Sequence, residues 1–112
     1  MLVHVRAQDQ SLLGAVQRHL EKRARAALGP MATRVASVGL ELSDINGPRG
    51  GVDLRCVVTV DLVPTGSLRA EATHADLLSA VGRALGRARR EIQGAARGRR
   101  RILLSRLDAP RG

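Results

Sequence analysis

The sequence predicts an α+β domain with the element order β-α-β-β-β-α, in which two helices pack on one face of a four-stranded mixed sheet. Apolar residues recur every three or four positions in two stretches and every second position in three others. The chain has 112 residues, of which 44% are hydrophobic, enough for one core. Each alternating stretch has a single apolar face, so both helices should cover that face and leave the other open to water.

The first part of the chain is predicted to form a strand, a helix and a second strand. Residues 2–6 form a short segment rich in apolar, β-branched side chains, which is typical of a strand. A helix is expected over residues 11–28, because apolar side chains recur there at helical spacing and Gly29-Pro30 ends the pattern. The period changes to two over residues 34–43. One side of this strand should carry Ala36, Val38, Leu40 and Leu42.

Two further strands and a second helix are expected in the rest of the chain. Residues 52–62 alternate most clearly, and a turn at residues 64–66 leads to a strand over residues 68–73. Thr73 and Asp76 have the spacing of a capping box before a helix that reaches Ile92 and frays at its later glycines, Gly94 and Gly98. We therefore predict one domain over residues 1–100 and a short basic tail over residues 101–112.

Basic charge is confined to particular segments. The net charge is +9, and eighteen of the nineteen basic residues are arginine. Residues 1–40 carry a net charge of +4, residues 41–76 a net charge of −3 and residues 77–112 a net charge of +8. An arginine-rich composition alone would not leave the middle third acidic, so this pattern favours a polyanionic partner.

Two basic rows at the spacing i, i+4, i+7 lie on the predicted helices. The first row is Arg18, Lys22 and Arg25, and the second is Arg83, Arg87 and Arg90, extended by Arg97. Helical geometry places each row on the side of its helix opposite the apolar positions. Guanidinium groups bind phosphate oxygens through two parallel hydrogen bonds. Outward helix faces are charged in most soluble proteins, but these rows contain no acidic residue. They therefore favour a surface that binds a phosphate backbone.

The loop over residues 43–51 allows two interpretations. Asn46-Gly47 between two alternating strands is first of all a hairpin signal. Glycines beside Arg49 can also cradle a phosphate, so Arg49 is an optional RNA contact. The spacing of a nucleotide-binding P-loop is missing.

Catalysis, a cofactor and a metal site are not predicted. The histidines lie in three different elements without ligand spacing, and the single cysteine, Cys56, falls on the core face of its strand. The carboxylates Asp53, Asp61 and Glu71 should lie on the open sheet face, where Arg55 and Arg69 can pair with them. The chain has no aromatic residue, which excludes RNA-binding modes that stack bases on aromatic rings. No segment has the length of a signal peptide's apolar core or of a membrane span, so we expect a cytoplasmic protein. We also expect no small-molecule substrate.

Residues 66–81 resemble the short ribosome hibernation factors, the group of the hibernation-promoting factor and ribosome-associated inhibitor A. There the family has a strand, an acidic helix start and a pair like Ala80-Val81. Arg87 and Arg90 match the family's basic pair, and Ile92 its buried aliphatic residue. The loop over residues 44–53 also looks like short members of the group. Further matches in the first helix are Ala15-Val16, His19-Leu20 and Arg23, and the resemblance covers about residues 1–97.

The resemblance implies a non-catalytic factor that binds rRNA of the small ribosomal subunit through both helices and blocks translation under stress. It implies the same β-α-β-β-β-α sheet, and it adds Arg23 to the two basic rows as an rRNA-binding residue. A general double-stranded RNA-binding module of similar topology is the alternative, and a protein adaptor that works through its open sheet face is a third. We expect a monomer in free solution, since the residues after about position 97 are too few for a second core.

Overall fold

A computed structural model describes residues 1–9, 11, 13–45 and 53–108, with side chains up to residue 94. The predicted element order, β-α-β-β-β-α, is confirmed. In chain order the elements are β1 (Leu2–Ala7), the short 3-10 helix η2 (Gly14–Val16), α1 (Gln17–Leu28), the 3-10 helix η3 (Gly29–Arg34), β2 (Val35–Asp44), β3 (Leu54–Leu62), β4 (Ser67–His74) and α2 (Leu77–Asp108).

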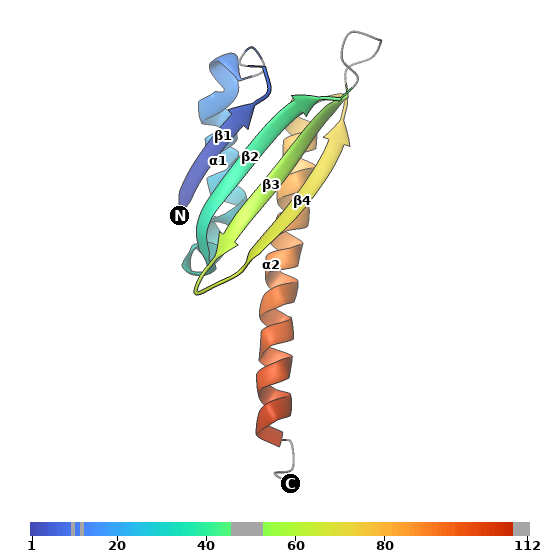
Figure 1. The fold of residues 1–112 in the computed structure, drawn as a ribbon. Coiled ribbons are helices and arrows are strands. Elements are labelled where there is room, and N and C mark those ends of the chain that lie inside the picture. Colours follow the sequence, from blue (N-terminus) through green and yellow to red (C-terminus); the bar gives the residue numbers. More distant parts are fainter. Residues whose placement is uncertain (10, 12, 46–52, 109–112) are drawn as a thin grey trace.

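The four strands form one mixed sheet in the order β1-β2-β3-β4. β1 runs parallel to β2, whereas the β2–β3 and β3–β4 pairs are antiparallel. Both helices lie on the same face of the sheet, α1 behind β1 and β2 and α2 behind β3 and β4 (Figure 1). The opposite face is open, as the single apolar face of the later strands predicts, and β1 and β4 are the edge strands.

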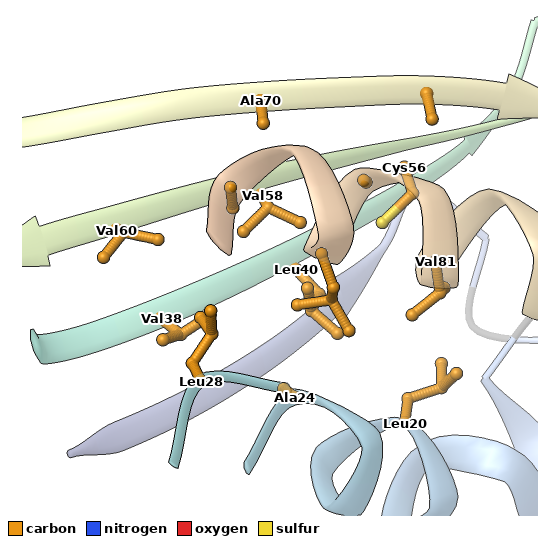
Figure 2. Close-up of a cluster of buried hydrophobic side chains, with 14 of the residues drawn as sticks. Leu20, Ala24, Leu28, Val38, Leu40, Cys56, Val58, Val60, Ala70 and Val81 are labelled. Atoms are coloured by element: carbon orange, nitrogen blue, oxygen red, sulfur yellow. The ribbon is translucent and has the colours of Figure 1, made fainter. Parts of the chain in front are cut away.

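The core between the sheet and the helices is aliphatic (Figure 2). Small side chains are frequent where α2 packs on the sheet, and alanines on both α2 and β4 allow helix and strand to approach closely. The buried side chains include Leu20, Ala24 and Leu28 of α1, Val38, Leu40, Cys56, Val58 and Val60 of the central strands, Ala70 and Ala72 of β4, and Ala80, Val81, Ala84, Leu85, Ala88 and Ile92 of α2.

The structure corrects the predicted face of Ala36. This residue is exposed, while Val35 before it is buried. The register with β3 shifts between Val35 and Ser37, which is a bulge of one residue in β2. A bulge breaks the alternation of side chains, so counting back by two from Val38 gives the wrong face for the first residues of the strand.

Both helix starts also differ from prediction. The chain enters α1 through η2, and Gly14 has φ of +36°, a left-handed conformation that glycine adopts without strain. α1 therefore begins at Gln17 instead of residue 11. At α2 the cap is Asp76 alone: its Oδ2 accepts hydrogen bonds from the backbone N–H of Ser79 at 2.9 Å and from the Ser79 hydroxyl at 2.8 Å. Thr73 belongs to β4 and takes no part in the cap.

α2 does not fray at Gly94 and Gly98 but continues to Asp108. Its 32 residues span about 48 Å at 1.5 Å per residue, and its second half extends past the end of the sheet (Figure 1). An isolated glycine costs a helix only about 1 kcal/mol relative to alanine, whereas the arginines, alanines and leucines around these two glycines favour helix. The backbone of residues 101–108 is thus part of α2.

Candidate nucleic-acid interface

The basic row of α1 lies on its solvent side. Arg18, Lys22 and Arg25 are exposed, while the residues on the opposite side, Leu20 and Ala24 among them, are fully buried. The Arg25 Nη1 atom also donates a hydrogen bond of 3.3 Å to the carbonyl oxygen of Met1. This row is therefore free to meet a partner, and one of its members also contacts the residue that precedes β1.

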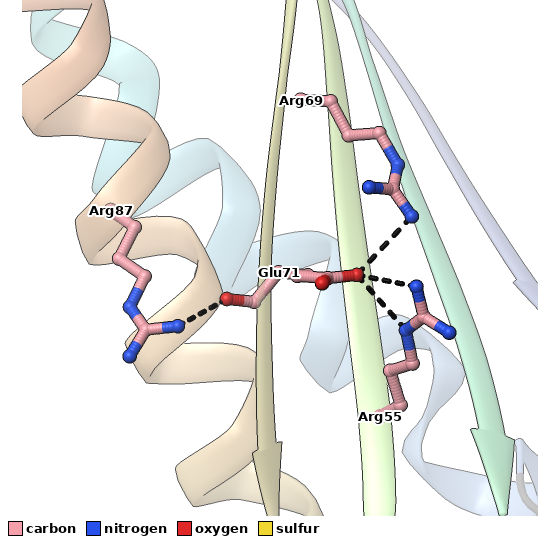
Figure 3. Close-up of polar contacts among 4 residues, drawn as sticks. All are labelled: Arg55, Arg69, Glu71 and Arg87. Atoms are coloured by element: carbon pink, nitrogen blue, oxygen red, sulfur yellow. Dashed lines mark hydrogen bonds and ion pairs between the residues drawn. The ribbon is translucent and has the colours of Figure 1, made fainter. Parts of the chain in front are cut away.

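The basic row of α2 is exposed as well, but it turns toward the edge of the sheet. Arg83, Arg87 and Arg90 are exposed, opposite the buried Val81 and Leu85. Arg87 reaches β4, where its Nη1 atom donates a hydrogen bond to the backbone carbonyl oxygen of Glu71 (Figure 3). Because β4 is an edge strand, this bond covers a carbonyl group that would otherwise face solvent. The guanidinium keeps further N–H donors for a ligand.

The two rows belong to one surface, because α1 and α2 cover the same face of the sheet. We call this surface the helical surface and define it by Arg18, Lys22, Arg25, Arg83, Arg87 and Arg90. Arg23 is half-buried and lies at the contact of the two helices, beside Gly82. The positions of Arg49 and of the Arg97 side chain lie outside the described residues, so their predicted RNA contacts stay predictions.

The ion pairs found among the described residues lie on the open sheet face. Glu71 Oε2 pairs with Arg55 Nη2 at 2.5 Å and with Arg69 Nη2 at 3.2 Å, as expected for carboxylates on this face (Figure 3). The hydrogen bond from Arg55, followed by the charges of Arg55 and Arg69, lowers the pKa of Glu71. Asp61 Oδ2 accepts a hydrogen bond of 2.8 Å from the Ser37 hydroxyl.

On the helical side, the Asp76 carboxylate caps α2 and has a lowered pKa. Hydrogen bonds from the hydroxyl and the backbone N–H of Ser79 lower the pKa of Asp76, and the charges of His74 and Arg23 add to this shift. None of the six residues of the helical surface makes an ion pair with a described residue. The ion pairs among the described residues thus join Glu71 to two arginines of the sheet face, and the six cations of the helical surface take part in none.

One arginine near this surface lies outside the predicted set. Arg69 of β4 lines a surface hollow of about 510 Å³ together with Arg87 and Arg90 of α2 and the carboxylates Glu71 and Glu91. At the β4 edge the helical surface therefore borders a hollow of mixed charge, in which Arg69 pairs with Glu71. Sequence spacing could not reveal this, because Arg69 and Arg87 become neighbours only when α2 packs on β4. The alternation of β4 predicts merely that Arg69 faces outward.

The histidine, cysteine and acidic side chains of the described residues form no metal-binding cluster: no group of three or more of them could hold a metal ion. His74 Nδ1 instead accepts a hydrogen bond of 2.9 Å from the backbone N–H of Asp76. Burial raises the pKa of the Cys56 thiol to about 12, so this sulfur remains a thiol at neutral pH. None of the described helices is both long and apolar enough to span a bilayer.

Comparisons with known proteins give likenesses in structure. No family model matches the chain, and no curated protein matches its sequence. The N-terminal domain of protein Y from Thermus thermophilus aligns with a TM-score of 0.65 and 24% identity over 82% of this chain and 96% of that domain. A ribosomal subunit interface protein from Coxiella burnetii aligns with a TM-score of 0.71 and 14% identity over 86% of this chain and 98% of that protein. The chain therefore has the fold of these two proteins, which is the fold that the resemblance in its sequence implies.

Proposed function

We propose that this protein binds rRNA of the small ribosomal subunit through its helical surface and thereby keeps the subunit from translating. One observation carries the proposal: the six exposed cations of the helical surface form no ion pair with a described residue, whereas Arg55 and Arg69 of the sheet face both pair with Glu71. Unpaired arginines on one surface are what a phosphate backbone requires, because each neutralised phosphate releases bound counterions.

The composition of the surface favours recognition of RNA shape. The chain has no aromatic residue on which a base could stack, so base-by-base recognition of single strands has no support. Structured RNA presents phosphates and 2′-hydroxyl groups at fixed spacing, which arginines on two helices can contact without unstacking a base. The structural likeness to a ribosomal subunit interface protein supports rRNA over other structured RNA.

Co-sedimentation with purified ribosomal subunits tests the proposal. We expect the protein to travel with the small subunit at near-physiological salt and to stay bound when a tenfold excess of unrelated duplex RNA is present. Displacement by the duplex would instead support a general double-stranded RNA-binding module. If the protein bound neither RNA, the open sheet face would become the candidate working surface, as in a protein adaptor.

A translation assay tests the inhibitory part of the proposal. Added to a cell-free translation reaction in slight excess over ribosomes, the protein should reduce peptide synthesis in proportion to the fraction of small subunits that it occupies. Occupied subunits with undiminished synthesis would show binding without inhibition and would contradict this part alone.

A further inference from the structure

Arg23 differs from the arginines of the basic rows in where its side chain lies. It is half-buried on the side of α1 that meets α2, instead of pointing outward. Its Nη2 atom lies so near Gly82 that a Cβ atom at that position would be 3.0 Å away, closer than ordinary van der Waals contact. The missing side chain at position 82 thus leaves the space that the Arg23 guanidinium occupies.

The backbone of α2 does not itself require glycine at this position. Gly82 lies inside the helix and has no positive φ. A glycine in a helix interior costs about 1 kcal/mol relative to alanine. Gly86, one turn later, would meet no atom within 4 Å if it carried a Cβ. Of these two glycines, only Gly82 makes room for another side chain.

Arg23 and Gly82 line an open hollow at the contact of the two helices. The hollow measures about 380 Å³, and its other lining residues are Leu78, Ser79 and Arg83. Two arginines, one from each helix, therefore line a space whose lining includes no carboxylate. The neighbouring carboxylate of Asp76 feels the charge of Arg23, but its hydrogen bonds come from the hydroxyl and the N–H of Ser79, and it forms no ion pair with Arg23.

We propose that this hollow is a seat for a single phosphate group of the RNA backbone, bound by Arg23 of α1 and Arg83 of α2 together. This proposal rests on the proposed function. It adds that one phosphate of the RNA is bound by both helices at once. Two guanidinium groups that share a phosphate offer it paired N–H donors from two directions. Such a contact fixes the RNA relative to both helices, whereas the other arginines of the two rows each contact a phosphate from one helix alone.

A double-mutant cycle on small-subunit binding tests whether the two arginines act on one group. Arg23→Gln and Arg83→Gln should each weaken binding about threefold to tenfold and lower the slope of log affinity against log salt by about 1. The double variant should lose clearly less than the product of the two single losses, with little further change in slope. The control pair, Arg18→Gln with Arg83→Gln, should lose the full product and lower the slope by about 2, because Arg18 lies outside the hollow.

A matched pair of glycine variants tests the space without changing the charge. Gly82→Leu should displace the guanidinium and reproduce the loss seen with Arg23→Gln, while Gly86→Leu should bind like the wild type. Gly86→Leu should melt no lower than the wild type, because leucine favours helix over glycine. Thermal melting shows whether Gly82→Leu, whose side chain crowds the contact of the two helices, stays folded.

Two results would overturn the shared seat: full multiplication of the losses in the Arg23–Arg83 pair, or wild-type binding by a folded Gly82→Leu variant. Either result would leave the proposed function intact, since the wild type would still bind the subunit. If the wild type itself did not bind, the proposed function would fail, and the seat would fail with it.

Discussion

The surroundings of single side chains decide which of them can change protonation state or react. Cys56 is fully buried among the side chains of β2, β3 and α2, where no charge or polar partner stabilises a thiolate. Asp76, in contrast, is exposed and receives two hydrogen bonds from Ser79. Burial raises the pKa of the first group and hydrogen bonding lowers the pKa of the second, so the two residues give opposite tests of the structure.

The Cys56 thiol should react only when the protein unfolds. Its pKa is raised to about 12, so almost none of it is ionised at pH 8, and the core closes off the sulfur. We expect a colorimetric disulfide reagent to label native protein at the rate of unfolding and to label the protein at once in concentrated denaturant. Immediate labelling in native buffer would show that the β2–β3 core is open.

Asp76 should stabilise α2 in a way that depends on pH. Because its folded-state pKa is lowered, its contribution to the free energy of unfolding is present above the ordinary carboxyl range and is lost as pH falls through the folded-state value. Asp76→Ala should therefore melt lower than the wild type at pH 7, and the gap should narrow below about pH 4. Asp76→Asn serves as the control, since asparagine caps helices without a titrating group. A gap that is constant from pH 7 to pH 3 would show that the charge has no part in the cap.

At the scale of elements, α2 combines structural and binding roles on different sides. One side of α2 contributes more buried residues to the core than α1 does. A second side covers the β4 edge through Arg87, and a third carries cations that point outward. β4 has a similar division, because its alanines face the core while Arg69 and Glu71 face solvent. The α2–β4 unit therefore links the stability of the sheet edge to the position of the cationic surface.

Reversing two charges on α2 should abolish binding without unfolding the protein. Arg87→Glu with Arg90→Glu removes two cations of the helical surface and adds two repulsive charges, so affinity for the small subunit should fall at least about 100-fold. Loss of the bond to the Glu71 carbonyl should lower the melting temperature only slightly. The matched control is Arg6→Glu with Arg34→Glu, which changes net charge equally at exposed positions of β1 and η3. Equal losses in both double variants would mean that net charge, and not the helical surface, governs binding.

The sequence predicts elements well where one periodicity is unbroken, and less well where tertiary packing decides. The alternation in β3 and the helical spacing from Val81 to Ile92 gave the correct buried faces. The face of Ala36 was wrong, because a bulge is visible only in the pairing of β2 with β3. The outward placement of both basic rows followed from spacing, but the contact of Arg23 with Gly82 depends on how α1 and α2 meet, which no local pattern encodes.

At the scale of the whole molecule, the net charge argues against self-association, and so does the small apolar surface of the residues whose side chains are described. Among the described residues the large apolar side chains that are exposed are Leu2, Ile45 and Val63, which lie in β1 and in two separate loops and form no common patch. A net charge of +9 also repels a second copy. We therefore expect a monomer at micromolar concentration and moderate salt in light scattering. A stable homodimer that is lost on deleting residues 101–112 would contradict this and would make the end of α2 an association element.

The same charge distribution makes a strong prediction about salt. If the six cations of the helical surface each neutralise one phosphate, the affinity for the small subunit should fall by about 10³-fold between 50 and 200 mM monovalent salt. A milder variant with Arg87→Gln and Arg90→Gln should show a flatter dependence, because fewer counterions are released when it binds. The stability of the free protein should change far less over this range, since its core is aliphatic and its ion pairs are exposed. Parallel measurements of subunit binding and of thermal melting at each salt concentration separate the two effects. A flat binding curve would show that the complex is held by contacts other than those of the helical surface with phosphates.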